Sequence, residues 1–173
     1  GALTGEVSGS QLVQLGVRYV IIGHSERRWK LGETDTIVNQ KLKAALRNQL
    51  TPIVCVGERK REESYKGILK TQVEATFEGV SSGDRERCLI AYEPVWAIST
   101  NPGDQPDTPE GAHESIAVIR QLLPESKILY GGSVNPENAA VFLSQPDIDG
   151  VLIGGASVRT QEFLKILTII ATI

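Results

Sequence analysis

Apolar residues gather in five short runs along this chain, and the longer stretches between them carry apolar positions at helical spacing. The runs are continuously apolar and rich in β-branched side chains, which is typical of parallel strands covered on both faces. We predict strands at about 18–23, 52–57, 88–92, 127–131 and 150–154.

Capping residues mark the starts of the intervening helices. Thr34 precedes an apolar stripe from Ile37 to Leu46, and Thr108 and Asn135 are each followed by a proline, which suits the first helical position. The predicted helices cover about 8–15, 34–46, 62–80, 108–123, 135–143 and 161–173, and the third is expected to be kinked or divided near residue 67.

The predicted order is one helix followed by five strand–helix units, without a linker or low-complexity stretch. Strands that alternate with helices form parallel sheets through right-handed crossovers. We therefore expect an α/β protein with a single domain over residues 1–173. Five units fit either an open, doubly wound sheet or most of a (β/α) barrel, and the pattern alone leaves both open.

Composition argues against several classes of function. The 173 residues are 40% hydrophobic and 23% charged, and the net charge of −3 leaves no basic excess for binding nucleic acid. No apolar stretch has the length of a membrane span, and residues 1–6 resemble neither a signal nor a transit peptide, which predicts a cytoplasmic protein. The mixed charges at 58–63 predict a solvated helix face.

The two cysteines, Cys55 and Cys88, lie inside apolar strand runs and are expected to be buried, reduced thiols. Cys and His do not cluster at ligand spacing, and no glycine-rich nucleotide motif is present, so we expect neither a metal nor a cofactor. His113 lies within a predicted helix and is expected at the surface.

Distinctive residues follow nearly every predicted strand. They are Gly23-His24-Ser25-Glu26, Gly57-Glu58, Glu93-Pro94-Val95-Trp96, Gly131-Gly132-Ser133 and Gly154-Gly155. In both candidate architectures the carboxyl ends of the strands form the binding edge, so these residues are expected to share a site.

Two of the strand ends carry groups suited to acid–base chemistry. Glu93 comes directly after an apolar strand, where partial loss of hydration makes a carboxylate a usable base; a salt-bridged carboxylate is the alternative. His24 precedes a polar turn, and if that turn opens a helix, its N–H groups lower the imidazole pKa and keep the ring neutral. A structural histidine at the base of a loop is the alternative there.

Paired glycines end the last two predicted strands, at Gly131-Gly132 and Gly154-Gly155. Each pair leads toward a helix, which makes a backbone cradle for phosphate; tight turns are the alternative. A base, a neutral imidazole and a phosphate cradle at one edge suit proton transfer beside the carbonyl of a small sugar phosphate.

Six segments, in order along nearly the whole chain, resemble the triosephosphate isomerase family. They are Gly1-Ala2-Leu3-Thr4-Gly5-Glu6, Gly23-His24-Ser25-Glu26-Arg27-Arg28, Val54-Cys55-Val56-Gly57-Glu58, Ala91-Tyr92-Glu93-Pro94-Val95-Trp96-Ala97-Ile98, Tyr130-Gly131-Gly132-Ser133-Val134 and Asp149-Gly150-Val151-Leu152-Ile153-Gly154-Gly155-Ala156-Ser157. The resemblance implies a (β/α)8 TIM barrel, of which five units are visible here. It also implies interconversion of D-glyceraldehyde 3-phosphate and dihydroxyacetone phosphate through an enediolate, in glycolysis and gluconeogenesis.

The same resemblance implies roles for single residues. Glu93 would be the base that moves the proton, His24 would polarise the carbonyl as a neutral ring, and the residues after Trp96 would form a lid. The substrate phosphate would be held by Ser99, Ser133, Gly154 and Gly155, with Glu26 in a supporting role. The family forms homodimers, and the Thr4 segment resembles the loop that one subunit places beside its partner's active site.

The chain also departs from the family pattern. It opens inside what resembles the third strand-to-helix loop, and no residue matches the asparagine and catalytic lysine that the family carries after its first strand. The lid stretch, 99–107, is a few residues longer than usual and contains Pro102 and Pro106. Two hypotheses follow. One is an isomerase that is active once its first strands are supplied by a longer gene, a second chain or strand exchange. The other is a non-catalytic phosphate-binding or assembly module of the same fold.

Overall fold

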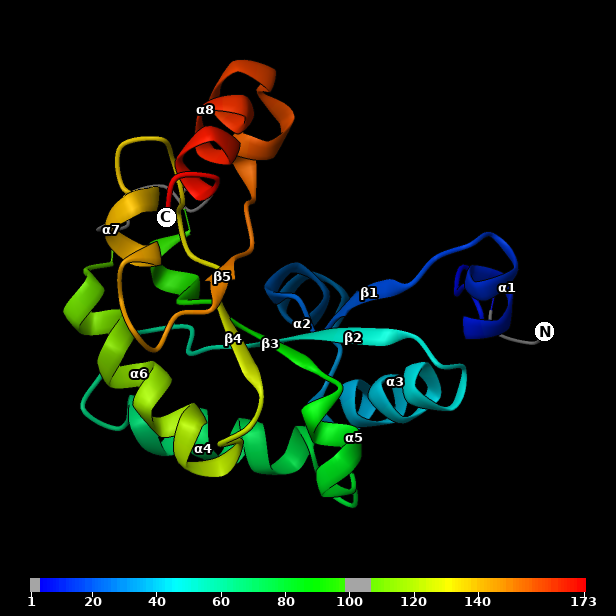
Figure 1. The fold of residues 1–173 in the computed structure, drawn as a ribbon. Helices are drawn as coiled ribbons and strands as arrows, with labels where there is room; N and C mark the ends of the chain where they lie inside the picture. The colour runs from blue at the N-terminus through cyan, green and yellow to red at the C-terminus, as the bar shows by residue number, and fades with distance from the viewer. Residues whose placement is uncertain (1–3, 99–106) are drawn as a thin grey trace.

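The computed structural model describes residues 4–98 and 107–173, and a five-stranded parallel sheet runs through its centre (Figure 1). The strands are β1 (Tyr19–Ile22), β2 (Thr51–Val56), β3 (Leu89–Tyr92), β4 (Lys127–Tyr130) and β5 (Gly150–Val151). Their spatial order is β1-β2-β3-β4-β5, so each strand pairs with its neighbour in sequence. A doubly wound sheet reverses its strand order part-way, whereas a barrel does not, so the sheet follows the barrel arrangement.

Every predicted helix is present, although two begin later than expected. The helices are α1 (Gly9–Gln14), α2 (Ser25–Leu31), α3 (Asp35–Arg47), α4 (Tyr65–Thr76), α5 (Ser82–Glu86), α6 (Pro109–Leu122), α7 (Ala139–Leu143) and α8 (Thr160–Ile170), with short 3-10 turns η1 (Val95–Ala97) and η2 (Gly155–Val158). The side chains of Thr34 and Thr108 accept hydrogen bonds from the first turns of α3 and α6, as predicted. α4 continues through Gly67 without a division.

The predicted helix start at Asn135 is wrong, because its side chain stabilises a separate turn. Asn135 Oδ1 accepts hydrogen bonds from the backbone N–H groups of Glu137 and Asn138, at 3.0 and 2.9 Å. These bonds satisfy the donors locally, and α7 begins only at Ala139.

The core lies on one face of the sheet. Ile22, Val54, Ile90, Tyr92 and Ile128 point to this face and pack in one buried cluster with apolar residues of α3, α4 and α6. These three helices lie side by side across the sheet in Figure 1.

The opposite face of β1 is not covered, which corrects the prediction that both faces of the strands are buried. The side chains of Tyr19 and Ile21 alternate with the core positions of β1 and are 58% and 48% exposed. Continuous apolar runs therefore do not identify which face the helices cover.

The charge run at 58–63 was predicted to be a solvated helix face, and this prediction is wrong. The segment forms the loop after β2, and α4 begins only at Tyr65. Glu58 is 1% exposed because its carboxylate is bound by side chains from elsewhere in the chain.

Other expectations concern groups outside the sheet edge. Cys55 and Cys88 are buried free thiols, as predicted, and His113 is exposed on α6. Within residues 4–98 and 107–173, no helix is long and apolar enough to cross a membrane. The same residues contain no group of three or more His, Cys, Asp or Glu side chains placed to hold a metal ion.

Candidate active site

His24 and Glu93 meet at the carboxyl edge of the sheet. His24 follows β1 and caps the start of α2, and Glu93 follows β3. The His24 Nε2 atom lies 2.9 Å from Glu93 Oε1, although the residues are far apart in sequence. The Glu93 side chain is 4% exposed and that of His24 is 36% exposed, so a nearly buried carboxylate lies behind a half-open imidazole.

Glycines at two strand ends allow this approach. Gly23 has φ +69, in the left-handed region, and turns the chain from β1 into α2. A Cβ atom at Gly57 would overlap the carbonyl group of Glu93, so the end of β2 can only pass Glu93 as glycine. The Glu93 backbone N–H donates to the Val56 carbonyl at 2.8 Å, which holds the residue against β2.

The hydrogen bonds around His24 define its tautomer. Nδ1 accepts from the backbone N–H of Glu26 at 3.3 Å and therefore carries no proton. The ring proton is then on Nε2, where it is donated to Glu93 Oε1. This arrangement suits a neutral imidazole whose N–H points toward the Glu93 carboxylate.

The pKa of His24 differs from the sequence-based prediction. The start of α2 was expected to lower it, but the hydrogen bond to Glu93 raises the pKa above its ordinary value, and burial opposes this only in part. The prediction considered the helix terminus alone and omitted the carboxylate that folding brings to 2.9 Å.

Glu93 is bound on both oxygens. Its Oε2 atom accepts the backbone N–H of Ser25 at 3.0 Å, while Oε1 faces His24. Both donors belong to the β1–α2 junction, so one short segment fixes the carboxylate. The Ser25 N–H was not anticipated, because backbone donors leave no signature in residue type.

A cavity of about 450 Å³ opens beside this pair. His24, Ser25, Glu26 and Glu93 line one part of it, and the glycine segments 131–133 and 154–155 line another. The structure thus brings the predicted catalytic pair and the predicted phosphate cradle around one space. The volume suits a small-molecule ligand.

The predicted phosphate-binding residues differ in their surroundings. The Ser133 hydroxyl donates to the Ala97 carbonyl at 2.9 Å, and Gly155 begins η2 with its backbone exposed. No atom lies within 4 Å of a Cβ built on Gly154, so this backbone is open. Ser99 and the predicted lid residues 99–106 lie outside the described residues, whereas Glu26 lines the cavity and pairs with Lys30 at 2.8 Å.

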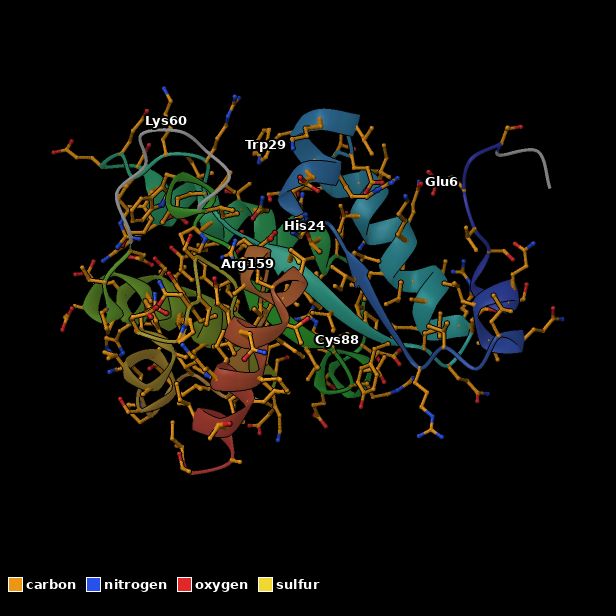
Figure 2. The ribbon with its side chains drawn as sticks, turned by 90° about the horizontal axis from the view of Figure 1, so that it is seen from above. Glu6, His24, Trp29, Lys60, Cys88 and Arg159 are labelled. Atoms are coloured by element: carbon orange, nitrogen blue, oxygen red, sulfur yellow. The ribbon has the colours of Figure 1, made fainter. Side chains whose placement is uncertain are left out.

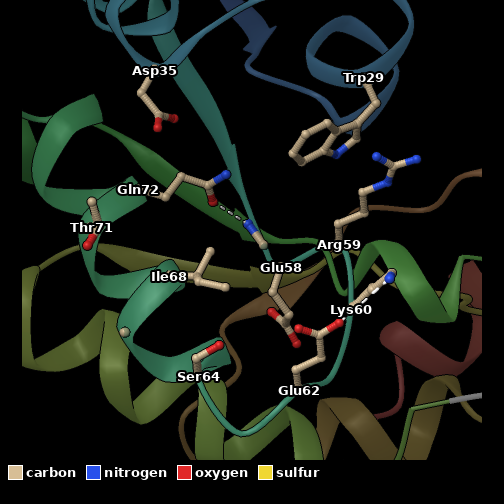
Figure 3. Close-up of a pocket in the computed structure, with 12 residues that line it drawn as sticks. Trp29, Asp35, Glu58, Arg59, Lys60, Glu62, Ser64, Ile68, Thr71 and Gln72 are labelled. Carbon is tan, nitrogen blue, oxygen red and sulfur yellow. Dashed lines mark hydrogen bonds and ion pairs between the residues drawn. The ribbon is translucent and has the colours of Figure 1, made fainter.

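Glu58 anchors the segment that follows Glu93. Its Oε1 atom accepts from Trp96 Nε1 at 2.8 Å, from Tyr92 Oη at 2.9 Å and from Arg61 Nη1 at 3.2 Å. Figure 3 shows Glu58 in a second cavity, of about 690 Å³, between α2, the loop after β2 and α4. Sequence reasoning missed this anchor, although a glutamate directly after a buried strand was a signal for it.

Cys55 is a further neighbour of the site. Burial raises the pKa of its thiol well above the ordinary value, and the nearby Glu93 carboxylate adds to the effect. The thiol is therefore protonated and acts as a small apolar group beneath the carboxylate.

Comparison with known proteins identifies the family. The family model described as triosephosphate isomerase matches residues 1–170. The chain belongs to the triosephosphate isomerase family. A triosephosphate isomerase from Moorella thermoacetica is 50% identical over 178 residues, covering 96% of this chain and 70% of the relative. Those from a Picosynechococcus species and from Carboxydothermus hydrogenoformans are 46% and 47% identical, and the matches cover 96% of this chain and 69% and 70% of the relatives.

Family membership confirms the predicted resemblance and the α/β barrel fold class. The five parallel strands in sequence order are the corresponding part of that barrel. The chain spans about 70% of the length of the Moorella relative.

Proposed function

We propose that this protein interconverts D-glyceraldehyde 3-phosphate and dihydroxyacetone phosphate, in glycolysis and gluconeogenesis. The observation that carries the proposal is the 2.9 Å contact between His24 Nε2 and Glu93 Oε1 beside the cavity with the glycine segments. A base and a hydrogen-bond donor at one point are what proton transfer beside a carbonyl requires.

The proposed reaction uses the two residues in different roles. The Glu93 carboxylate removes a proton from the carbon beside the substrate carbonyl, and the His24 Nε2–H donates to the carbonyl oxygen, where negative charge develops. His24 then gives its Nε2 proton to the charged oxygen and takes up the proton of the neighbouring hydroxyl. Glu93 returns its proton to the former carbonyl carbon, so the hydroxyl and carbonyl exchange places. Ser99, Ser133, Gly154 and Gly155 are proposed to bind the phosphate, and Glu26 to support the site.

For this reaction Glu93 must exchange its present partners. Both of its oxygens accept hydrogen bonds from the β1–α2 junction. The substrate carbonyl competes with Glu93 Oε1 for the His24 N–H, so substrate binding frees the carboxylate. When Glu93 moves away, the main cause of the raised His24 pKa is removed, which favours the neutral ring.

Substitution of the proposed base tests this function. We expect Glu93→Asp to reduce kcat by about a hundredfold or more, because shortening the side chain by one methylene withdraws the carboxylate by roughly 1 Å. Activity should be measured on chain purified from a host that lacks its own isomerase. Glu86→Asp, on exposed α5, is the matched control and should keep wild-type activity.

One result would contradict the proposed function, and a second would favour the alternative function. Wild-type activity no higher than that of Glu93→Asp would contradict catalysis by this chain. Phosphate binding without activity would then favour a non-catalytic phosphate-binding module of the same fold.

We further propose that the whole chain forms one domain of a cytoplasmic homodimer with the Thr4 segment at the interface. Thr4 is exposed, and the buried free thiols of Cys55 and Cys88 suit a reducing compartment. A monomer mass by light scattering across the micromolar range would contradict the dimer, and recovery outside the cytoplasmic fraction would contradict the location.

A further inference from the structure

The candidate site presents a charge problem to a phosphate ester. Two of the residues that line the cavity, Glu26 and Glu93, are acidic, and glycine N–H groups bring only partial positive charge. Among the described residues that line the cavity, the permanently cationic side chains are Lys30 and Arg159. Either side chain could supply full positive charge to a doubly charged phosphate group.

Arg159 is placed beside the glycine segment. It directly follows η2, which begins at Gly155, and its backbone N–H donates to Ala156 at 3.2 Å. Figure 2 shows Arg159 at the start of α8 and His24 at the start of α2; both residues line the cavity. Arg159 thus lines the cavity on the same segment as the proposed phosphate cradle.

The Arg159 side chain also has unused donors. Its Nε–H donates to Glu162 Oε1 at 2.6 Å, which orients the guanidinium. Neither Nη group has a hydrogen-bond partner among residues 4–98 and 107–173. A guanidinium with both Nη groups available matches two phosphate oxygens in a bidentate fashion.

Lys30 differs from Arg159 both in the pairing of its charge and in its position around the cavity. Its ammonium pairs with Glu26 at 2.8 Å, so its charge is already matched by an acidic group of the cavity. It projects from α2, which belongs to the His24 part of the site rather than to the glycine segments.

We propose that Arg159 is a phosphate-binding residue of this site, oriented by Glu162 and donating through its Nη groups to the substrate phosphate. The proposal rests on the proposed function, because it assigns a further residue to the same site. It assigns part of substrate affinity to a side chain, in addition to the backbone cradle.

Binding of inorganic phosphate, followed by ³¹P NMR, tests the proposal without requiring activity. We expect Arg159→Gln to raise the dissociation constant of phosphate by about tenfold, as for loss of a charge-assisted hydrogen bond. Arg159→Lys keeps the charge but loses the fork, and should give an intermediate value. Where the chain is active, Arg159→Gln should raise KM for glyceraldehyde 3-phosphate by a similar factor and change kcat little.

Arg87→Gln is the matched control. Arg87 forms an exposed pair with Asp84 at 3.0 Å and spacing i,i+3, as Arg159 does with Glu162, but it lies on the α5 side of the molecule. Arg87→Gln therefore removes the same charge and the same kind of pair, and phosphate binding should stay as in wild type.

Three outcomes would overturn the proposal. The first is a dissociation constant for Arg159→Gln equal to that of Arg87→Gln. The second is an equal loss in Lys30→Gln, which would indicate the general potential of the cavity rather than a specific contact. The third is no phosphate binding by the wild-type chain. This last result also contradicts the proposed function, whereas the first two leave it standing.

Discussion

At the scale of single residues, two buried carboxylates are central, one in the candidate site and one that anchors the segment after it. Glu93 and Glu58 are 3% and 1% exposed, and each accepts several hydrogen bonds. Such networks stabilise a structure only when the partners are in place, because an unpaired buried charge costs several kcal/mol. The site is therefore sensitive to changes in residues that never contact a ligand.

Asp107, which precedes the cap of α6, provides a test of this sensitivity. Burial raises the pKa of its carboxyl from 3.8 to about 6. The folded protein therefore binds a proton at this position more tightly than the unfolded chain, so stability decreases as pH rises between these two values. We expect Asp107→Asn to remove this decrease.

The measurement is the free energy of unfolding in urea at several pH values, compared as wild type minus variant. Asp84→Asn, on α5, is the control and should retain the wild-type slope. An Asp107→Asn variant that follows the wild-type pH dependence would show that the carboxyl is ionised normally in the folded state.

Single residues could be placed from the sequence where a general rule of the fold determines their position. Glu93 and His24 were expected to meet because the carboxyl ends of parallel strands share an edge, and they lie 2.9 Å apart. Glu58 was misplaced because its partners Tyr92 and Trp96 lie 34 and 38 positions away in the sequence. No local charge pattern contains that information.

At the scale of elements, the close approach of the chain just after β2 to the chain just after β3 depends on a glycine, Gly57. A Cβ atom at Gly57 would overlap the carbonyl of Glu93, which is backbone and has no rotamer to adopt. The strand ends would have to separate, and Glu93 would move with them. The position of Glu93 and the stability of the fold therefore depend on the same glycine.

We expect Gly57→Ala to destabilise the protein by about 3 kcal/mol or more, as overpacking against fixed backbone does. Gly67→Ala is the control, because nothing lies within 4 Å of a Cβ at that position of α4. The control should stabilise the protein by about 0.5–1 kcal/mol through helix propensity. The free energy of unfolding of both variants is measured by urea denaturation. Equal denaturation midpoints for wild type and Gly57→Ala would show that a Cβ at this position does not overlap the Glu93 carbonyl.

Element prediction was accurate where the signal is local and failed where side chains compete. Thr34 and Thr108 marked helix starts because capping involves residues only three positions apart. Asn135 carries a similar signal, but its side chain binds two N–H groups of a preceding turn and delays α7. Sequence alone does not decide between these two uses of an asparagine.

At the scale of the whole molecule, packing is concentrated in the middle of the sheet. β2, β3 and β4 contribute fully buried residues to the core, whereas α1 buries none and α8 buries only Ile166. Local opening should therefore be easiest at the two ends of the chain and hardest at the centre.

Amide hydrogen exchange measures this directly. We expect the slowest exchange in β2, β3 and β4, and exchange at least about tenfold faster in α1 and α8. If the amides of α8 exchange as slowly as those of β3, the expectation is wrong, and α8 is stabilised by contacts other than the burial of Ile166. Each measured rate is compared with the intrinsic exchange rate of the same amide in an unfolded chain, which depends on the neighbouring side chains.

The hydrogen bonds that hold Glu93 also bear on selectivity. A carbonyl oxygen that gains negative charge during proton transfer is a stronger acceptor for the His24 N–H than a hydroxyl oxygen, so a phosphate ester without a carbonyl competes less well with the Glu93 carboxylate for this donor. If Glu93 acts as the proposed base, discrimination between phosphate esters should therefore appear in turnover more than in affinity.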